Sequence, residues 1–383
     1  MDTPQILAYY LPQFHSFPEN DLWWGKGFTE WTNVRKARPL FPGHRQPRIP
    51  TELGYYDLRN PEIRQRQADL ARLAGVTAFC YWHYWFNGKQ LMNTIIDDVV
   101  RLNEPQFPFC MAWANESWYK KMWGKDSSED KLLIEQTYGD DSECRAHYLY
   151  MRTLFESSLY YRVEGRPFFM VYKPSDIPNI EGFINNWNKW IREDGIADSI
   201  YFVADINYTE DYHKHISQGF DAVTAPLRAR VLYTHYNLRR GHNRIADLRR
   251  KYLHWPYSIR MKNINRNILD TTFDLAENVI PNLYPQWDHT PRSGANGIVV
   301  TGATPSQFKE QAAKILSFVN QKKNKIVMLK SWNEWAEGNY MEPDSLYGRG
   351  FIEALASVMS NYCNKNSETQ VNSIEEKQLS PHI

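Results

Sequence analysis

Eight short apolar runs, separated by segments of helical periodicity, are the feature of this chain that most constrains its fold. The runs are rich in β-branched and aromatic residues and are bounded by turn residues, as is typical of strands buried on both faces. The predicted strands are Ile6–Tyr10, Val76–Tyr84, Phe107–Ala114, Pro167–Lys173, Ile200–Ile206, Ala222–Ala225, Val279–Tyr284 and Ile326–Trp332. Strands that alternate with helices build a parallel sheet covered by helices, so the pattern predicts an α/β fold.

Six segments between or after the strands have the periodicity of helices that bury one face. They are Pro61–Leu73, Met92–Leu102, Ser142–Leu154, Ile180–Glu193, Pro305–Val319 and Gly350–Ser360. Eight strands alternating with helices favour a (β/α)8 TIM barrel. A doubly wound open sheet is the main rival, but such sheets often carry a glycine-rich phosphate loop after the first strand. Here that position reads Pro12-Gln13-Phe14-His15, which favours the barrel.

The length of 383 residues suits one large domain or two ordinary ones. We expect residues 1–363 to form a single catalytic barrel and residues 364–383 to be a disordered polar tail. A basic insertion is expected after the sixth strand, at about residues 228–270. Within it, Arg228 to Arg266 holds eleven Lys and Arg residues but a single acid, Asp247. The whole chain has a formal net charge of only +1, so overall charge indicates no partner.

The basic segment 228–266 has three open interpretations. It could bind the phosphates of a lipid-linked carrier or an acidic glycan, it could rest on an anionic membrane surface, or it could be a solvated, partly helical excursion. Nucleic acid is not an expected partner, because the chain has no recognisable nucleic-acid-binding module.

The N-terminus lacks the basic start and long apolar core of a secretory signal, and no stretch approaches the ~20 apolar residues of a membrane-spanning helix. We therefore expect a cytoplasmic protein, with the inner membrane as a peripheral contact. No cofactor or metal is expected, because the four cysteines form neither a CxxC pair nor a zinc pattern. His15, His83 and His289 lie near predicted strand ends without an HxH or HExxH pattern, and are interpreted as hydrogen-bonding groups for sugar hydroxyls.

Aromatic, amide and carboxylate residues gather where the predicted strands end. In a TIM barrel, the carboxyl ends of the strands build the active site. The candidate substrate-binding residues at these exits are Tyr9, Glu30, Trp31, Trp82, Tyr84, Trp85, Trp113, Asn115, Glu116, Tyr172, Asp205 and Trp287. Aromatic residues make up 15% of the chain. Flat ring faces that meet sugars explain part of this content, and a large aromatic core is the alternative explanation.

The last predicted strand leads into residues 331–343, which read Ser-Trp-Asn-Glu-Trp-Ala-Glu-Gly-Asn-Tyr-Met-Glu-Pro. Glycosidic cleavage needs an acid that protonates the leaving oxygen and a base or nucleophile that acts on the sugar. Glu334 and Glu337, three residues apart among indole rings, are therefore the candidate catalytic pair. The remaining candidate substrate-binding residues of this motif are Trp332, Asn333, Trp335 and Glu342.

Several of these residues also have structural alternatives. One of the two glutamates could cap the following segment or pair with a loop arginine, and Asn333 could close the turn instead of bonding a sugar hydroxyl. Asn115 and Glu116 could form a simple turn at a strand end. Alternatively, Glu116 is the nucleophile of an ordinary double displacement, with Glu334 or Glu337 as the acid.

The Trp332–Pro343 run resembles the signature of glycoside hydrolase family 99, the endo-α-mannosidases. The start Ile6–His15 and the runs Gly27–Val34 and Trp113–Glu116 more closely resemble the family-99-like proteins called WbsX, which are found in bacterial O-antigen and capsule gene clusters. The resemblance covers about Ile6 to Leu355 and consists of several long motifs in the same order.

The resemblance implies a (β/α)8 barrel and a retaining mechanism without a covalent enzyme intermediate. In that mechanism the first glutamate assists the sugar 2-hydroxyl as it attacks its own anomeric carbon, and a 1,2-anhydro sugar forms. The second glutamate protonates the leaving oxygen and later activates the acceptor. Carried over to this chain, Glu334 is the base and Glu337 is the acid/base. Ala336 stands where endo-mannosidases typically carry His, so the resemblance does not imply mannose as the sugar.

Together these features predict an enzyme that cleaves or transfers at a glycosidic bond with retention, in the biosynthesis of lipopolysaccharide O-antigen or capsule polysaccharide. The expected substrate is an oligosaccharide or a lipid-linked glycan. A nucleotide-sugar-dependent glycosyltransferase is one alternative, since WbsX-type proteins are commonly described as glycosyltransferases. The chain has no Rossmann-like phosphate loop and no clear metal-binding DxD motif to support it. A non-catalytic glycan-binding protein is the other alternative.

Overall fold

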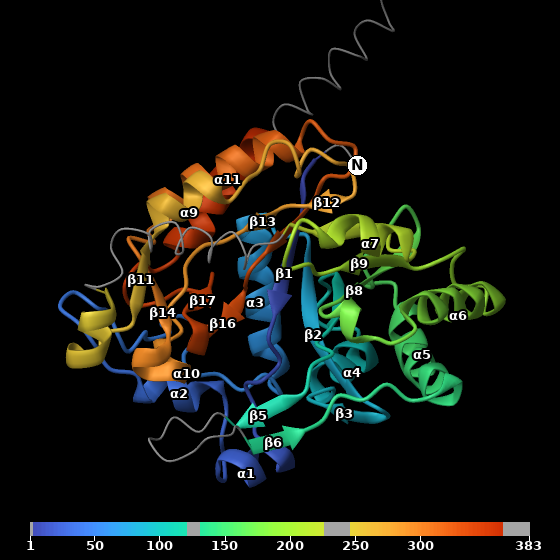
Figure 1. Ribbon diagram of the computed structural model, residues 1–383, viewed down its shortest axis with the longest axis horizontal. Coiled ribbons are helices and arrows are strands. Elements are labelled where there is room, and N and C mark those ends of the chain that lie inside the picture. The colour runs from blue at the N-terminus through green and yellow to red at the C-terminus, as the bar shows by residue number, and fades with distance from the viewer. Residues whose placement is uncertain (1–2, 121–130, 226–245, 363–383) are drawn as a thin grey trace, which may run out of the picture.

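The computed structural model describes residues 3–120, 131–225 and 246–362 (Figure 1). A parallel sheet in this part of the chain follows the order β12-β10-β9-β8-β4-β2-β1-β15-β13. The bounds are β1 Gln5–Tyr10, β2 Ala78–Phe86, β4 Phe109–Trp113, β8 Arg166–Val171, β9 Tyr201–Ala204, β10 Ala222–Thr224, β12 Val279–Ile280, β13 Asn282–Leu283 and β15 Ile326–Leu329. Every predicted strand has a counterpart here, so the eight-strand prediction is confirmed.

The seventh predicted strand is divided into β12 and β13 by Pro281. Proline has no N–H to give to a neighbouring strand, which interrupts the ladder at this point. Its carbonyl oxygen still accepts a hydrogen bond of 3.0 Å from Met328 N. Because β12 pairs with β10 while β13 pairs with β15, the two halves bring the ends of the sheet together. The result is a nearly closed parallel barrel, which confirms the predicted TIM-barrel fold.

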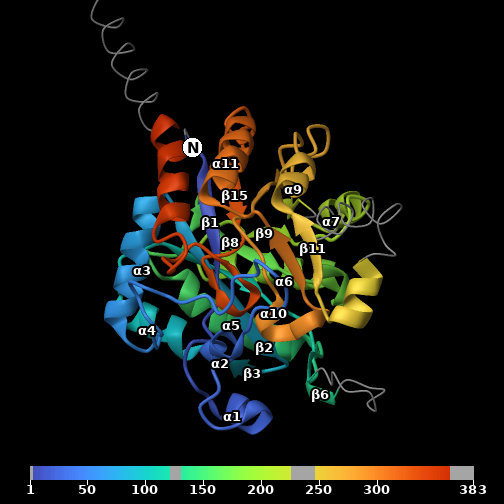
Figure 2. The same ribbon diagram turned by 90° about the vertical axis from the view of Figure 1, so that its left-hand side faces the viewer.

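Helices surround the barrel (Figures 1 and 2). Their bounds are α3 Pro61–Ala74, α4 Thr94–Leu102, α5 Asp141–Phe155, α6 Ile180–Glu193, α7 Asp211–Ser217, α9 Met261–Asn267 and α11 Pro305–Val319, and residues 350–362 are also helical. The six predicted helices are confirmed, whereas α7 and α9 were not predicted. Three of these helices begin after a residue whose side-chain oxygen accepts a hydrogen bond from a backbone N–H of the first turn. These capping residues are Asn60 for α3, Asp140 for α5 and Thr304 for α11.

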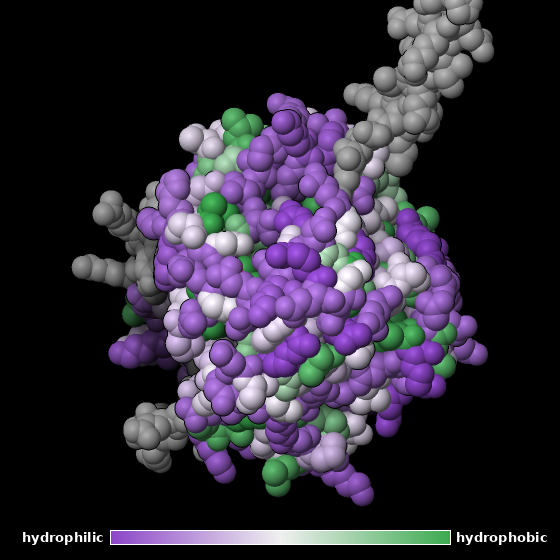
Figure 3. Space-filling model, turned by 90° about the vertical axis from the view of Figure 1, so that its right-hand side faces the viewer, coloured by the Kyte–Doolittle hydropathy of each residue, from purple (hydrophilic) through white to green (hydrophobic). Residues whose placement is uncertain are grey.

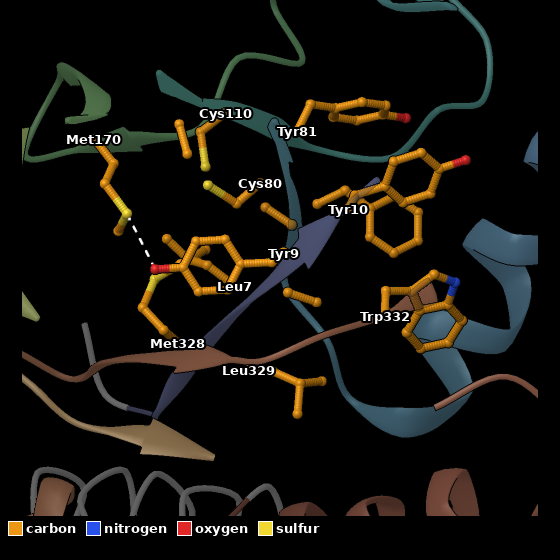
Figure 4. Packing of buried hydrophobic residues seen from close by; sticks show 14 of the residues in the cluster. Leu7, Tyr9, Tyr10, Cys80, Tyr81, Cys110, Met170, Met328, Leu329 and Trp332 are labelled. Atoms are coloured by element: carbon orange, nitrogen blue, oxygen red, sulfur yellow. Dashed lines mark hydrogen bonds between the residues drawn. The ribbon is translucent and has the colours of Figure 1, made fainter. Parts of the chain in front are cut away.

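Alternate residues of the strands point to opposite sides of the barrel wall. Leu7, Tyr9, Cys80, Cys110, Met170 and Met328 lie together on one side, while Tyr10, Tyr81 and Trp332 pack on the other (Figure 4). The Tyr9 hydroxyl group lies 3.1 Å from the sulfur of Met170. Cys80 and Cys110 are buried free thiols, as expected for small apolar residues.

Short elements cover the end of the barrel where the strands finish, at the lower side of Figure 1. They are α1 Pro18–Trp24, α2 Glu30–Lys36, β3 Lys89–Leu91, β5 Trp118–Lys120, β6 Lys131–Ile134, η1 Pro174–Asp176, α10 Thr290–Ser293, η2 Gly294–Asn296, β16 Asn333–Glu334, η3 Trp335–Glu337 and β17 Asn339–Tyr340. The hairpin strand β7 Arg162–Val163 precedes β8. Both α2 and α10 contact η3, so segments from the two ends of the chain meet at this side.

The C-terminal half of the predicted basic insertion is anchored to the molecule. Residues 246–253 are helical, and β11, Tyr257–Arg260, pairs in parallel with β14, Ile298–Thr301, outside the barrel sheet. Ile259, Met261 and Ile264 are buried. From Tyr257 onward this half packs on the molecule, while most of the helical residues 246–253 are exposed. Residues 226–245 and the predicted tail lie outside the described residues.

The outer face over α5 and α6 carries mainly hydrophilic side chains with scattered hydrophobic ones (Figure 3). Among the helices that the structure describes, none is long and apolar enough to span a bilayer. The division into a barrel of residues 1–363 and a tail stays a prediction.

Candidate active site

The 331–343 motif folds back over the first strand immediately after β15 ends. Trp332 N donates to Tyr9 O at 2.8 Å, and Met341 N donates to Trp332 O at 2.9 Å. Between these bonds, β16 and β17 pair as an antiparallel hairpin with the 3-10 turn η3 at its tip. The 3-10 turn η3 ends at Gly338. The φ angle of Gly338 is +56°, a left-handed backbone conformation that glycine adopts without steric cost. This local fold places both catalytic candidates at the carboxyl end of the barrel.

Glu334 is the more deeply buried of the two candidate catalytic acids, with 4% of its surface exposed. Its Oε1 accepts a hydrogen bond of 2.8 Å from the indole Nε1 of Trp82, a neutral donor on β2. Burial raises the pKa of Glu334 and the nearby Glu337 raises it further, while Lys330 opposes both effects. A raised pKa favours the protonated form of this carboxyl group.

Glu337 has the opposite electrostatic environment. Its Oε1 lies 2.5 Å from Nη1 of Arg292 and 3.9 Å from Nε2 of His289. Burial alone would raise the pKa of Glu337, but Arg292, His289 and Lys330 together lower it to about 2. The two carboxyl groups are therefore driven apart in pKa, an arrangement typical of acid and base pairs in enzymes.

Arg292 joins the carboxylate of the catalytic candidate Glu337 to that of Glu30, a predicted substrate-binding residue. Its Nη2 donates to both oxygens of Glu30, at 3.0 Å each, while Nη1 donates to Glu337. Glu30, on α2, is only 2% exposed and also accepts a 2.9 Å hydrogen bond from Ala336 N. The structure thus brings Glu30 to the predicted site, where it fixes Arg292 and the turn that carries Glu337.

Lys330 lies beside a pair of aromatic rings at the mouth of the barrel. Tyr9 and Trp82 stack with ring centroids 4.9 Å apart and planes 12° apart. The ammonium of Lys330 lies 5.3 Å from the Tyr9 centroid and 5.5 Å from the Trp82 centroid. In the part of the chain that is described, it makes no hydrogen bond or ion pair. Tyr172 meets Trp82 edge-on at 5.6 Å and extends this aromatic surface.

Three aromatic residues of the predicted site pack instead beneath the motif. Trp332 and Trp335 are at most 1% exposed, and Trp335 stacks on Tyr340 with centroids 3.8 Å apart. Trp31 packs against Trp335 at 5.4 Å and donates its indole N–H to Tyr56 O. The structure places these rings in the aromatic core that was the alternative explanation for the high aromatic content.

Asn333 and Glu342 make bonds within the protein. Asn333 accepts from Leu11 N at 2.7 Å and donates to Leu11 O at 3.0 Å, so it holds the chain that leaves β1. Glu342 accepts hydrogen bonds from Trp335, Gln67 and Tyr56 at 2.6, 2.6 and 2.9 Å. Burial raises the pKa of Glu342 to about 7, although these donors oppose the rise. For both residues, contact with a substrate stays a prediction.

Trp85 and Trp113 lie among the residues that pack against the outer helices. Trp85 stacks on His147 of α5 with centroids 4.6 Å apart, and Trp113 stacks on Phe183 of α6 at 5.7 Å. Asn115 is fully buried and bonds both the N–H and the carbonyl oxygen of Lys173, each at 2.8 Å. These contacts stabilise the strand exits and leave little of these three side chains for a sugar.

The remaining predicted residues are Glu116, Asp205, Tyr84 and Trp287. Two of them bond to other protein groups, and the other two are buried or partly buried aromatic residues. Glu116 pairs with Lys173 at 2.6 Å, and Asp205 accepts a 2.5 Å hydrogen bond from Thr224. Tyr84 is buried, and burial together with the charge of Glu334 raises its pKa. Trp287 is partly buried, with its ring 5.7 Å from that of Tyr284.

Sequence reasoning missed Arg292, Lys330 and Tyr284. Tyr284 is fully buried, and burial followed by the charges of Glu337 and Glu334 raises the pKa of its hydroxyl. Tyr284 ends the seventh predicted strand and Lys330 lies within the eighth, so their positions at strand exits could have signalled them. Arg292 lies on a four-residue helix with Pro291 in its first turn and has no comparable signal.

The residues that the structure describes contain no cluster of three or more metal-ligating side chains. The arrangement that they do contain is an acid pair beside an aromatic surface at the carboxyl end of a parallel barrel. Fold and site together define a (β/α)8 barrel with two neighbouring carboxyl groups and an aromatic surface at the carboxyl ends of its strands.

The chain belongs to the glycosyltransferase WbsX family, whose model matches residues 6–355. It is 33% identical over 361 residues to the uncharacterized protein WxcX of Xanthomonas campestris pv. campestris, in each of two strains. The match covers 93% of this chain and 49% of WxcX, so the chain spans about half the length of the curated relatives it matches.

Two solved structures share the fold. A glycoside hydrolase-like protein superimposes with a TM-score of 0.59 and 14% identity, covering 94% of each chain. The GH99 endo-alpha-mannosidase from Bacteroides thetaiotaomicron superimposes with a TM-score of 0.51 and 14% identity, covering 95% of this chain and 98% of its own. The expected likeness to WbsX proteins and to the family 99 fold is confirmed.

Proposed function

We propose that this protein cleaves or transfers at a glycosidic bond with retention, through Glu334 and Glu337, during the assembly of an O-antigen or capsule polysaccharide. The observation that carries the proposal is the pair itself. One carboxyl group is buried against the neutral donor Trp82, and the other is ion-paired to Arg292. Such a difference supplies a proton donor and a proton acceptor at one site.

The stacked rings of Tyr9 and Trp82 support a sugar as the substrate. Trp82 contacts Tyr9 through its ring face and Glu334 through its indole N–H, so the aromatic surface and one acid are fixed to each other. Apolar ring faces bind the C–H faces of sugars, while the polar edge orients hydrogen-bonding groups. Hydrolysis and transfer differ in whether water or a sugar hydroxyl receives the activated carbon.

A product assay tests this function. Lipid-linked oligosaccharide isolated from the source cell is incubated with the wild-type protein, and products are resolved by mass spectrometry. Glu334→Gln and Glu337→Gln are each expected to reduce turnover at least ~100-fold, because each removes a proton-transfer group. Glu116→Gln tests the alternative in which Glu116 is the nucleophile, since Glu116 pairs with Lys173 at the same barrel end. Full activity of either motif variant, or loss of activity in Glu116→Gln alone, would contradict the proposal.

A nucleotide-sugar-dependent transferase is the second candidate, favoured by the name of the family. It predicts that a UDP- or GDP-sugar raises the melting temperature of the protein. A flat melting profile across a donor panel would leave glycan cleavage or transglycosylation as the better function. A non-catalytic glycan-binding protein would instead bind oligosaccharide without forming any product.

We further propose a cytoplasmic location at the inner membrane, supported by the basic composition of residues 228–266. Flotation with liposomes that contain or lack acidic lipid tests this location. Partitioning that does not depend on acidic lipid would remove the membrane from the proposal.

A further inference from the structure

A series of aromatic rings leads from the acid pair toward the rim of the barrel mouth. Trp82 and Tyr84 are two residues apart on β2, so their side chains lie on the same side of the strand. Trp82 bonds Glu334, and Tyr84 meets the ring of Trp118 on β5 edge-on, with centroids 5.1 Å apart. The aromatic surface beside the acids therefore continues onto a second element that covers this end of the barrel.

The series then passes from β5 to the short helix α1. Trp23 meets Trp118 edge-on, with centroids 5.9 Å apart. Its neighbour Trp24 stacks on Phe28, with centroids 5.6 Å apart and planes 26° apart. Both α1 and β5 lie at the end of the barrel where the strands finish (Figure 1). Rings from three separate segments of the chain thus form one series that leaves the acid pair. We call Trp23, Trp24 and Trp118 the rim rings.

The exposure of the rings rises along the series. Tyr84 is 8% exposed, Trp118 and Trp23 are partly buried, and Trp24 is 40% exposed. A ring that only closed the barrel end would be covered by its neighbours, whereas a tryptophan held at the surface offers ring area to a ligand. The outer end of the series therefore has more ring area than core packing uses.

Two polar contacts hold α1 at the rim. Nζ of Lys120 on β5 donates to Trp23 O at 2.9 Å, and Nζ of Lys89 on β3 pairs with Glu19 at 2.8 Å. The ammonium of Lys120 also lies 5.0 Å from the ring centroid of Trp24. A ring that is fixed before a ligand arrives loses little entropy on binding, and an ammonium has three hydrogen-bond donors. The rim thus combines a fixed flat ring with a donor that suits hydroxyl groups.

The arrangement of the rings favours a glycan chain over a lipid surface as the ligand. A bilayer would meet the exposed rim alone, because its contact ends at the depth of an interface. The series instead runs inward from Trp24 to Tyr84 and the acid pair. A chain of sugars presents apolar faces and hydroxyl groups along its whole length, which matches rings repeated along a path.

We propose that the rim rings Trp118, Trp23 and Trp24 form remote subsites, which bind sugars of an oligosaccharide beyond those that lie at the acid pair. The protein then recognises a glycan several sugars long. The inference rests on the proposed function for the class of ligand, whereas binding at the rim does not require turnover.

Titration with glycans of different length tests the remote subsites. The probes are lipid-free oligosaccharides released from the surface polysaccharide of the source cell and separated into a short and a long fraction. Protein labelled with fluorotryptophan is followed by fluorine NMR, and each signal is assigned by a Trp→Phe substitution. We expect the Trp82 signal to move with both fractions and the signals of the rim rings to move with the long fraction only. Rim signals that stay unchanged with the long fraction would overturn the proposal.

Affinities of variants measure the contribution of the outermost ring. Trp24→Ala should weaken binding of the long fraction about tenfold and leave binding of the short fraction unchanged. Because Trp24 is 40% exposed, its removal leaves the barrel core intact. Trp190→Ala is the matched control, since Trp190 on the outer helix α6 also has a cation near its ring, with Arg145 4.7 Å from the centroid. The control should bind both fractions as the wild type does.

Three results for Trp24→Ala would count against the remote subsites. They are unchanged affinity for the long fraction, an equal loss for both fractions, and normal glycan binding combined with weaker flotation on liposomes that contain acidic lipid. The last result would make the rim a lipid contact. Since turnover is not measured, the outcome is separate from the product assay. Length-dependent binding without any product would contradict the proposed function and leave the remote subsites standing.

Discussion

The indole Nε1 of Trp82 donates a 2.8 Å hydrogen bond to Oε1 of Glu334, which lies 252 residues further along the chain. Trp82 is on β2 and Glu334 follows β15, and β1 separates the two strands in the sheet. The bond crosses the mouth of the barrel and is the main direct polar contact that orients the Glu334 carboxyl group.

Trp82→Phe should lower turnover about tenfold, because it removes the indole N–H that holds Oε1 of Glu334 while keeping an aromatic ring. Turnover at saturating substrate is the measurement. Trp85→Phe is the matched control, since Trp85 lies on the same strand but packs against α5. It should reduce the free energy of unfolding and leave turnover near the wild-type value. Equal losses of turnover would contradict an orienting role for Trp82.

Gly338→Ala should destabilise the protein far more than Gly348→Ala. The two glycines have φ angles of +56° and +53°, so alanine carries the same backbone cost of about 1 kcal/mol at each. An added Cβ at Gly338 would lie 2.7 Å from Asp288 N, whereas nothing lies within 4 Å of one at Gly348. We expect a further loss of about 2 kcal/mol at Gly338, measured by urea unfolding. Similar losses of unfolding free energy at both positions would contradict this prediction, because they would show that the loop around Asp288 moves to accommodate the added Cβ.

Glu342→Gln should flatten the pH dependence of stability. The pKa of Glu342 is raised by burial to about 7 from an ordinary 4.5, so the folded state binds its proton more tightly than the unfolded state. Stability from this group is complete below pH 4.5 and is lost as pH rises through 7, by about 3 kcal/mol. Unfolding free energies at pH 5 and pH 8 should therefore differ less in the variant than in the wild type. If the unfolding free energies of the variant and the wild type changed with pH in parallel, the pH dependence would not come from the protonation of Glu342.

Asn333→Ala should lower the free energy of unfolding and have little effect on substrate KM. It removes the two hydrogen bonds to Leu11 and leaves a buried N–H and a buried carbonyl oxygen without that partner. We expect a loss of about 2–4 kcal/mol in unfolding free energy. Substrate KM should stay within about threefold of the wild-type value, measured under conditions in which the variant is folded. A large rise in KM without destabilisation would instead support the predicted contact between Asn333 and a sugar.

The strands and helices of the barrel could be predicted from the sequence, because the burial of a parallel strand appears in its own residues as a continuous apolar run. The acid pair could be predicted for a similar reason, since Glu334 and Glu337 lie three residues apart in one short motif. Neither prediction required knowledge of a distant segment.

The environment of the pair depends on distant segments, so it could not be predicted in the same way. Arg292 lies on the short helix α10, and no local pattern indicates that it reaches Glu30 on α2. The direction of each tryptophan also depends on register. Trp82 and Trp85 belong to one run, yet three residues apart on a strand they point to opposite sides. The sequence therefore indicated aromatic strand ends but not which rings meet the acids.

The pairing of β1 with β15 delays assembly of the site during protein synthesis. Gln5 is in register with Ile326, so the first strand keeps an unpaired edge until some 320 further residues have been made. At ribosomal rates of about 5–20 residues per second, this interval is roughly 15–60 s. Throughout that time neither Glu334 nor Glu337 has been incorporated, so the candidate catalytic pair is absent from the nascent chain until the barrel can close. The open strand edge makes this period the one in which the chain is most exposed to aggregation and to chaperones.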